Sequence, residues 1–264
     1  GIRDSVASRG LGDVYKRQDG ALVTVEPNEE PKSLQEAYQV QKEVNSLLSP
    51  SSNAWKVGST SEEAQLKLGT TEPGAARVPE QFKFRDGDKI PVFSSHDLWV
   101  EGEFAISIGK DLPPREQPYI YEEVYSAIDG VAPSLEFVGS RLKNGLAGSG
   151  RLSVTADGGA NVALCVGQVV HDWVDVDLAT QRVSLTLNGT EVASGVGSNA
   201  LEDPINVVLW LANHKRVSQG LFAGEIISTG TCTGLTKVAP GDRVRAEFGP
   251  IGSINTWLVD QGID

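Results

Sequence analysis

The spacing of apolar positions predicts helices in four stretches of the chain. Residues 33–48, SLQEAYQVQKEVNSLL, place apolar side chains three and four positions apart, as one face of a helix requires. A serine at the start with a glutamate three positions later is a capping-box pattern. Residues 61–68, SEEAQLKL, predict a second, shorter helix, which a following glycine closes. Further helices are expected over residues 121–128 and 204–217.

From about Ile90 onward the pattern changes to the alternation typical of β-strands. Residues 99–108, WVEGEFAISI, alternate strictly and place an apolar or small residue at every second position. Residues 183–192, VSLTLNGTEV, predict a hairpin, because Asn-Gly is the preferred pair for a type I′ turn. Residues 238–259 predict short strands separated by turns that contain glycine or proline.

These elements predict an α+β fold, a strand-rich mixed β domain with a few flanking helices. The sequence contains no internal repeat, low-complexity tract or long linker, so residues 19–264 are expected to form a single domain. Within it, residues 19–75 would form a helical N-terminal part and residues 76–264 a strand-rich core.

Residues 1–18 do not continue this pattern. They have little hydrophobic periodicity, and residues 8–18, SRGLGDVYKRQ, resemble the translation of a sequencing-transposon adapter. We therefore expect residues 1–18 to be an assembly artefact rather than a natural disordered tail, and the folded domain to begin after them.

Composition and charge narrow the function classes. The 264 residues carry a formal net charge of −12 without a basic stripe, which argues against a nucleic-acid partner. No apolar run approaches the roughly 20 residues that a membrane-spanning helix needs. The two cysteines and three histidines are scattered, which favours buried thiols and solvent-facing histidines over a disulfide or zinc site. With no signal peptide in the sequence, the cytoplasm is the expected location.

Three glutamates are the strongest candidates for chemistry. Glu101 and Glu103 are two positions apart on a predicted strand, so both carboxylates project from the face opposite the apolar row. Such a pair is also common on a solvated strand face. Glu136 lies in the otherwise apolar or small run VAPSLEFV, where a buried carboxylate must be paired, protonated or bound to metal. Oxygen ligands without thiols favour Mg²⁺ or Mn²⁺ over Zn²⁺.

Lys56 is the other unusual charge. It lies in the short apolar run AWKVG. A desolvated lysine loses basicity and becomes usable for proton transfer or for binding a carboxylate. The alternative is a surface lysine whose stem alone is buried.

Several segments together resemble one enzyme family. They are AWKVGSTSEEAQLKLG at 54–69, VEGEFA at 100–105, APSLEFVGSR at 132–141, GVGSNALEDPINVVLWLAN at 195–213 and AGEIISTGTCTG at 223–234. In order and spacing these segments resemble 2-keto-4-pentenoate hydratases and 4-oxalocrotonate decarboxylases of the fumarylacetoacetate hydrolase superfamily. The resemblance extends from about Lys32 to Val259. It implies a strand-rich α+β fold and a homodimer or a larger assembly of dimers.

The resemblance also implies roles for particular residues. The metal ligands, for Mg²⁺ or Mn²⁺, would be Glu101, Glu103 and Glu136. The catalytic residues would be Lys56, Glu80 as a general acid/base, and Asp157. A small 2-oxo or 2-hydroxydienoic acid would be held by polar residues of the matching segments: Ser140, Arg141, Asn161, Thr231 and Thr233. Residues 76–264 would thus be the metal-binding part of the domain.

Three departures from the family pattern bear on the reaction. Glu80 and Gln81 stand where relatives often carry an Asp-Asp pair, and the longer side chain of Glu80 moves its carboxylate. Gly139 stands where relatives carry a carboxylate before Ser-Arg, and residues 158–161, GGAN, replace small hydroxyl residues that would help to hold a substrate carboxylate. The first hypothesis is a hydratase-type lyase acting on 2-hydroxy-2,4-dienoates or 2-oxo acids in aromatic-compound degradation. The alternatives are a 2-oxo-acid decarboxylase, an acylpyruvate carbon–carbon hydrolase, and a paralogue that has lost catalysis. The hydrolase branch needs a His/Glu pair, and no histidine here lies in a matching motif.

Overall fold

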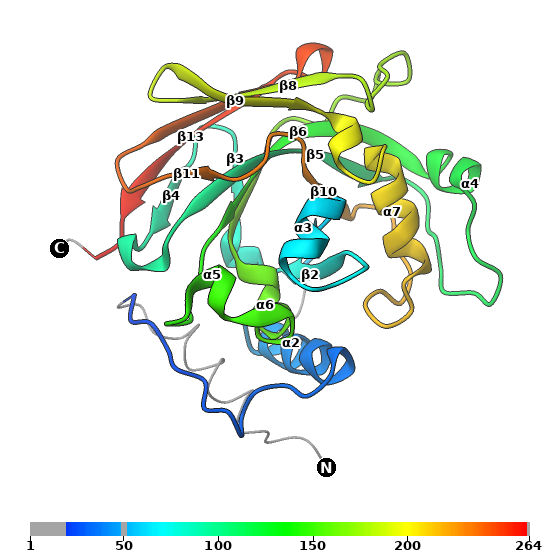
Figure 1. Cartoon of the computed structure of the whole chain (residues 1–264). Helices are drawn as coiled ribbons and strands as arrows, with labels where there is room; N and C mark the ends of the chain where they lie inside the picture. Colours follow the sequence, from blue (N-terminus) through cyan, green and yellow to red (C-terminus); the bar gives the residue numbers. More distant parts are fainter. Residues whose placement is uncertain (1–19, 49–51, 263–264) are drawn as a thin grey trace.

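A computed structural model describes residues 20–48 and 52–262 of the chain (Figure 1). The predicted artefact at residues 1–18 lies outside the described residues. The predicted strand-rich α+β fold is confirmed: two β-sheets pack together, and a few helices flank them.

The larger sheet positions the candidate site. Its strands lie in the order β2-β1-β10-β5-β6-β7-β3, and β11 pairs with β5. Their bounds are β1 (Ala54–Gly58), β2 (Gly74–Val78), β3 (Lys83–Arg85), β5 (Trp99–Ile108), β6 (Ile128–Val138), β7 (Asn161–Val166), β10 (Ile226–Thr231) and β11 (Thr236–Lys237). Figure 1 shows β5 and β6 as long, strongly curved strands. Ala54 of β1 and Val78 of β2 pack against Leu164 of β7, so the sheet curls until distant strands meet on its concave face.

The smaller sheet covers the convex face of the larger one. Its order is β4-β13-β12-β8-β9, with bounds β4 (Lys89–Val92), β8 (Arg182–Leu187), β9 (Thr190–Val196), β12 (Arg243–Glu247) and β13 (Ser253–Asp260). The predicted hairpin is confirmed: β8 and β9 are joined at Asn188 and Gly189, whose φ angles of 53° and 86° are those of a type I′ turn.

The main core fills the space between the two sheets. The alternation of β5 directs Val100, Phe104 and Ile106 into this core. There they meet residues of the second sheet such as Leu185 and Phe248; the rings of Phe104 and Phe248 pack edge to face, 5.2 Å apart. Because this face is apolar, the other residues of β5 project to the concave face, which leaves that face available for polar groups.

The helices follow the sequence pattern in most places. Their bounds are α2 (Leu34–Leu48), α3 (Glu62–Lys67), α4 (Tyr121–Tyr125), α5 (Gly145–Gly148), α6 (Gly150–Ala156) and α7 (Pro204–Asn213). Asp203 starts α7 by accepting a hydrogen bond from the Ile205 amide, 2.8 Å away, and Ser61 caps α3 in the same way. The helices expected over 121–128 and 204–217 are shorter than predicted, and β6 already begins at Ile128.

Helix α2 attaches the N-terminal part to the larger sheet. Ala37, Val40 and Val44 form a separate apolar cluster with Leu142 and Ala156. The polar side chain that interrupts this apolar stripe also has a partner inside: Gln41 donates hydrogen bonds to the carbonyls of Thr155 at 2.7 Å and Ala75 at 3.3 Å.

Some expectations from the sequence are wrong. Strands begin at Ala54 rather than near Ile90, so the part expected to be helical also contains β1 and β2. Helices α5 and α6 were not expected, because their run of glycine and serine residues carries little helical pattern. Short 3₁₀ turns also occur at η1 (Glu80–Phe82), η2 (Ser94–His96), η3 (Gly158–Ala160), η4 (Gly197–Asn199) and η5 (Gly249–Ile251).

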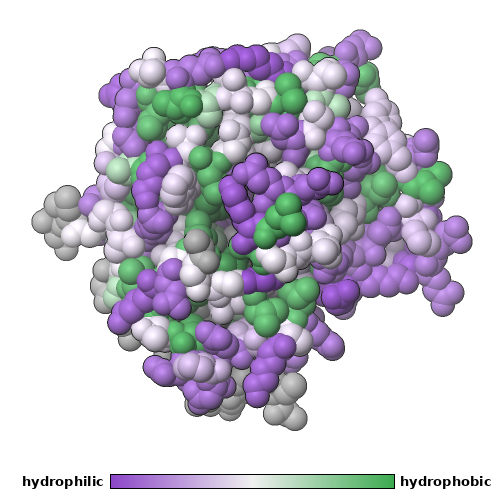
Figure 2. Space-filling view, in the orientation of Figure 1, coloured by the Kyte–Doolittle hydropathy of each residue, from purple (hydrophilic) through white to green (hydrophobic). Residues whose placement is uncertain are grey.

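The helix lengths and the distribution of apolar residues on the surface agree with the expectations drawn from the composition. Within residues 20–48 and 52–262, none of the helices has the length and apolar character needed to cross a bilayer. On the face shown in Figure 2, hydrophobic residues are scattered among hydrophilic ones rather than gathered into one broad patch. The thiols of Cys165 and Cys232 are free and buried, as expected.

Candidate active site

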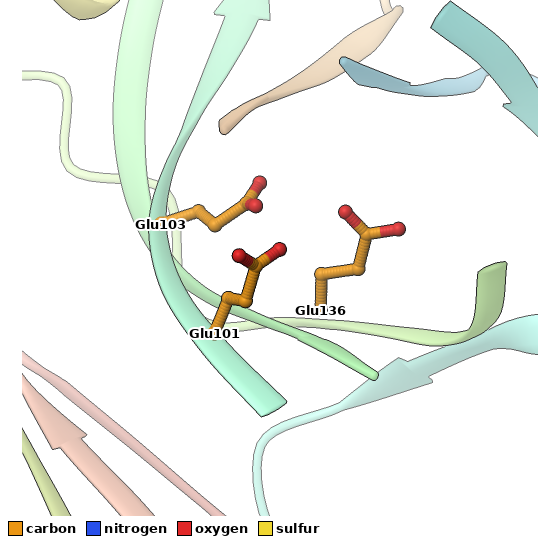
Figure 3. A group of neighbouring side chains, drawn as sticks. All are labelled: Glu101, Glu103 and Glu136. Carbon is orange, nitrogen blue, oxygen red and sulfur yellow. The ribbon is translucent and has the colours of Figure 1, made fainter. Parts of the chain in front are cut away.

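Three glutamates converge on the concave face of the larger sheet. Glu101 and Glu103 come from β5 and Glu136 from β6, and their carboxylates point toward one another (Figure 3). Each offers one oxygen that lies within 4.8 Å of the others. In the antiparallel ladder Glu101 is the direct partner of Glu136. The predicted placement of Glu101 and Glu103 opposite the apolar row is therefore confirmed, and the sheet adds Glu136 to them.

The Glu103 side chain is fully buried, and among the described residues only one of its two carboxylate oxygens accepts hydrogen bonds. Its Oε2 accepts hydrogen bonds from the Ser228 hydroxyl at 2.6 Å and the Gly230 amide at 3.0 Å, both on β10. Its Oε1 is buried without a hydrogen-bond partner among the described residues. Burial, followed by the charges of Glu136 and Glu101, raises the pKa of Glu103 well above its ordinary value.

Glu136 shows the same division between a held and an unpaired oxygen. Its Oε1 accepts a hydrogen bond from the Asn161 amide at 3.0 Å and forms an ion pair with the Lys56 ammonium, also at 3.0 Å. In the described part of the chain, nothing pairs with the buried Oε2. Asn161, predicted to bind substrate, is thus placed to orient a carboxylate of the cluster.

Glu101 is the most exposed of the three carboxylates. Burial and the neighbouring charge of Glu136 raise its pKa to about 7, while Lys56 and a hydrogen bond from Thr231 act in the opposite direction. Near neutral pH a proton and a cation would therefore compete for this carboxylate.

Lys56 is a buried, charged lysine rather than a weakly basic one. Its Nζ donates to the Gly159 carbonyl at 2.9 Å in addition to its contact with Glu136. Burial alone lowers the pKa of Lys56, but the charges of Glu136 and Glu103 outweigh that effect, so its pKa lies above the ordinary value. The expectation that burial makes this lysine less basic is wrong, because the sequence did not reveal how many carboxylates surround it.

The residues present fit a hard divalent cation. Three carboxylates face one ammonium group, which leaves an excess of negative charge in a buried place. The unpaired oxygens Glu103 Oε1 and Glu136 Oε2 are donors of the kind that Mg²⁺ and Mn²⁺ prefer.

Arg141 and Asp157 lie behind this cluster and contact each other. They form a buried ion pair at 3.4 Å, and Arg141 also donates to the Asn161 carbonyl. Ser140 exchanges hydrogen bonds with the backbone of Leu142 at 3.0 and 3.1 Å. These contacts fix the turn that presents Asn161.

The two threonines predicted to bind substrate differ in position. Thr231 lies beside Glu101 and accepts a hydrogen bond from the Gly234 amide at 2.8 Å. Thr233 accepts one from the Gly102 amide at 3.0 Å and so holds the backbone of β5 between the two glutamates.

Glu80 does not join the cluster. About 60% of its side chain is exposed, and it forms an ion pair with Lys83 at 2.8 Å. It lines a cavity of about 410 Å³ together with Ala54 and Ile226. These two residues precede Lys56 and Ser228 by two positions, so the cavity adjoins the same concave face.

The histidines are not arranged as expected. His96 is buried, and burial together with Arg141 lowers its pKa to about 4. His214 is mostly buried and lies 3.6 Å from Glu72, and only His171 is solvent-facing. All three belong to the described residues, and none forms a hydrogen bond or an ion pair with the glutamate cluster.

Sequence reasoning missed three contributors that act through small groups. Ser228 and Gly230 bind Glu103, and the Gly159 carbonyl binds Lys56. Gly230 has φ +88°, and a side chain there would overlap Thr60. Ser228 and Gly230 lie in the small-residue run STGT, and Gly159 lies in GGAN at 158–161; surface loops also carry such runs.

Comparisons with known proteins match the same region of the chain. The Fumarylacetoacetate (FAA) hydrolase C-terminal family matches residues 56–259. The chain is 33% identical over 202 residues to a 2-keto-4-pentenoate hydratase of Paraburkholderia xenovorans (strain LB400), covering 76% of this chain and 74% of the relative. It is 29% identical over 235 residues to a 2-oxo-hept-4-ene-1,7-dioate hydratase of Escherichia coli, covering 86% and 87%.

A solved structure agrees over nearly the whole chain. It is 4-oxalocrotonate decarboxylase from Pseudomonas putida G7, complexed with magnesium and adipate, with a TM-score of 0.85 and 25% identity over 96% of this chain and 97% of that one. The matched family spans Lys56 and all three glutamates. The chain belongs to the fumarylacetoacetate hydrolase family.

Proposed function

We propose that the chain is a Mg²⁺- or Mn²⁺-dependent lyase of the hydratase type, acting on small 2-hydroxy-2,4-dienoic or 2-oxo acids in aromatic-compound degradation. The observation that carries the proposal is the glutamate cluster, in which two buried carboxylate oxygens face a shared space beside a charged lysine. Two similar proteins named as hydratases support the reaction type.

The cation would be held by Glu101, Glu103 and Glu136. When bound, it would supply positive charge that stabilises the enolate form of a 2-oxo acid. Ser228, Gly230 and Asn161 hold Glu103 and Glu136 in fixed positions.

Lys56 supplies the second positive charge. Its Nζ is held by the Gly159 carbonyl and Glu136, so it has a third donor position free to bind the substrate carboxylate or to move a proton at the substrate carbon. Glu80 is retained as the proposed general acid/base, and Asp157 as a catalytic candidate that acts through Arg141 and Asn161. Loss of hydration with unchanged Mg²⁺ binding in Glu80→Gln would support the role of Glu80.

The test follows the ultraviolet absorbance of a 2-hydroxydienoate, which falls as water adds to the conjugated system. We expect turnover with Mg²⁺ or Mn²⁺, none with a chelator, and a loss of at least about a hundredfold in Glu136→Gln. Glu191→Gln on the β8–β9 hairpin changes an exposed carboxylate and serves as the matched control. Tight Mg²⁺ binding without turnover of any dienoate or 2-oxo acid would favour the inactive paralogue instead.

A 2-oxo-acid decarboxylase is the second candidate. It is favoured by the structural likeness to 4-oxalocrotonate decarboxylase. Release of carbon dioxide from a 2-oxo-enedioic acid, without hydration of dienoates, would select it. An acylpyruvate hydrolase has less support, because no histidine contacts the cluster in the described structure. We also propose a cytoplasmic location and a homo-oligomer built from dimers. Light scattering of the purified protein tests the oligomeric state.

A further inference from the structure

The concave face carries a second cation close to Lys56. Gly58 and Gly74 are direct partners in the antiparallel β1–β2 ladder. A Cβ built on Gly58 would lie 3.3 Å from Lys56 Nζ, and a Cβ built on Gly74 would lie 2.8 Å from a guanidinium nitrogen of Arg151. Arg151, from α6, therefore occupies the space over Gly74 on the same face as Lys56.

The separation of these two cations is bounded by the ladder. Cβ positions of antiparallel partners are about 5 Å apart, so the nearest nitrogen of Arg151 lies within about 12 Å of Lys56 Nζ. The two partner positions are both glycine, so the ends of the Lys56 and Arg151 side chains, rather than side chains at these positions, lie over this part of β1 and β2.

The guanidinium of Arg151 forms no direct ion pair with a described carboxylate. It donates to the Ser59 hydroxyl at 3.3 Å and to the carbonyls of Glu72 at 3.3 Å and Pro73 at 2.7 Å. Its Nε is buried and has no acceptor among the described residues. The Glu72 carboxylate is near enough for its charge to raise the pKa of Arg151 against the larger effect of burial, but it lies beside His214 and Arg216 and forms no ion pair with Arg151.

A partly buried cation without a direct ion pair is suited to an anionic ligand. Taking a charge out of water is costly unless an opposite charge compensates it. Burial accordingly lowers the pKa of Arg151 from its ordinary value. A carboxylate on the substrate would supply the missing charge and would accept the remaining N–H donors.

We propose that Arg151 binds the distal carboxylate of the substrate, so that the enzyme prefers 2-oxo or 2-hydroxydienoic acids with two carboxylates. The inference rests on the proposed function, which places the first carboxylate and the 2-oxo group at Lys56 and the glutamates. The chain of a short linear diacid would then span the distance of at most about 12 Å between Lys56 Nζ and the Arg151 guanidinium on this face. Arg151 is thereby a specificity-determining residue.

If Arg151 had only a structural role, its loss would affect ligand binding differently. The hydrogen bonds from Arg151 also fasten the segment before β2 to α6. If that were its only role, loss of the guanidinium would weaken binding of monoacids and diacids alike. Only a direct contact with the distal carboxylate makes the loss specific to diacids.

The experiment compares two probes that share the 2-oxo-acid head, 2-oxoadipate and 2-oxohexanoate, by calorimetric titration into the Mg²⁺-loaded protein. We expect the wild type to bind 2-oxoadipate about tenfold to a hundredfold more tightly, as a hydrogen-bonded charge pair provides. In Arg151→Met we expect this preference to vanish while the Kd for 2-oxohexanoate changes less than about threefold. Arg151→Lys should keep part of it, because the charge remains.

Arg182→Met is the matched control, since it removes an exposed guanidinium from the distant hairpin and should keep the full preference. Equal Kd values for the two probes in the wild type would overturn the inference, and this arm requires no variant. Parallel weakening of both probes in Arg151→Met would also overturn it. If neither probe binds the folded wild type with Mg²⁺, the proposed function fails and the inference with it; if both probes bind with equal Kd values, the inference alone fails.

Discussion

Glu101 and Glu136 are direct partners across the β5–β6 ladder. Like charges in this position destabilise a sheet, and burial increases the cost because less water screens them. Lys56 pairs with only one of the carboxylates in the group. The metal-free protein therefore contains an unfavourable interaction that a divalent cation would relieve.

Divalent cations should accordingly stabilise the fold. At a free Mg²⁺ or Mn²⁺ concentration of about a hundred times Kd, we expect the free energy of unfolding to rise by about 2.7 kcal/mol. Thermal unfolding with the metal and with a chelator measures the effect. Glu191→Gln should retain it, because this carboxylate lies on the distant hairpin. A Glu136→Gln variant that gains as much stability as the wild type would contradict the proposed ligand set.

The pH dependence of stability should reveal Glu101. Its pKa is raised from 4.5 in the unfolded chain to about 7 in the folded protein, so the folded state retains a proton that the unfolded state releases. The stability contributed by this proton is complete below about pH 4.5 and is lost as the pH rises through about 7. In the metal-free protein, the wild type should therefore lose on the order of 2 kcal/mol more than Glu101→Gln across this window. Urea unfolding at a series of pH values tests the difference, and identical pH profiles would contradict it.

Removal of the buried ammonium should be costly. Lys56→Met leaves Glu136 buried with Asn161 as its remaining hydrogen-bond partner. Breaking a buried ion pair from one side costs about 3–5 kcal/mol. Urea unfolding in the presence of a chelator measures this loss. The double variant Lys56→Met/Glu136→Gln should be more stable than the sum of the two single changes predicts, and simple additivity would argue against the pair.

Gly159 should be required for the position of Lys56. Its φ is +69°, and a Cβ there would lie 3.1 Å from Lys56 Nζ. Gly145 has nearly the same φ, +67°, with nothing near its Cβ position, so it is a matched control for backbone strain. Both substitutions to alanine should cost about 1–2 kcal/mol of stability. Only Gly159→Ala should also lower kcat/KM, by roughly a hundredfold, because it displaces the ammonium. Equal kinetic effects of the two variants would contradict this positioning role.

The sequence predicted the glutamates well because strand periodicity is local. Strict alternation placed Glu101 and Glu103 on the polar face, and the apolar surroundings of Glu136 required a partner for its charge. What alternation could not supply is the register, which sets Glu101 opposite Glu136. Register depends on the whole sheet and is not visible in either strand alone.

The surroundings of the other site residues also depend on contacts between distant segments. β1 is short, and its residues other than Lys56 are apolar or small, so the sequence alone does not reveal the partners that neighbouring segments such as η3 bring to this lysine. Arg141 and Asp157 pair with each other, and their roles at the substrate stay predictions. The role of Glu80 rests on the resemblance alone, and its side chain forms an ion pair with Lys83. Arg151 lies in no recognisable motif. Its position near Lys56 depends on the pairing of Gly58 with Gly74 in β1 and β2, which the sequence does not show.

The parallel pairing of β1 with β10 has a consequence for the order of folding. It sets Lys56 beside Ser228, although the two strands are far apart in the sequence. Closing such a long loop costs entropy that local contacts do not repay, so this pairing is expected among the slow steps of folding. Because Ser228 holds Glu103, the cluster is incomplete until that step has occurred. Ligand capture by the cluster would therefore be a reporter of completed folding, and a nascent chain would acquire it only after Ser228 and Gly230 have been synthesised.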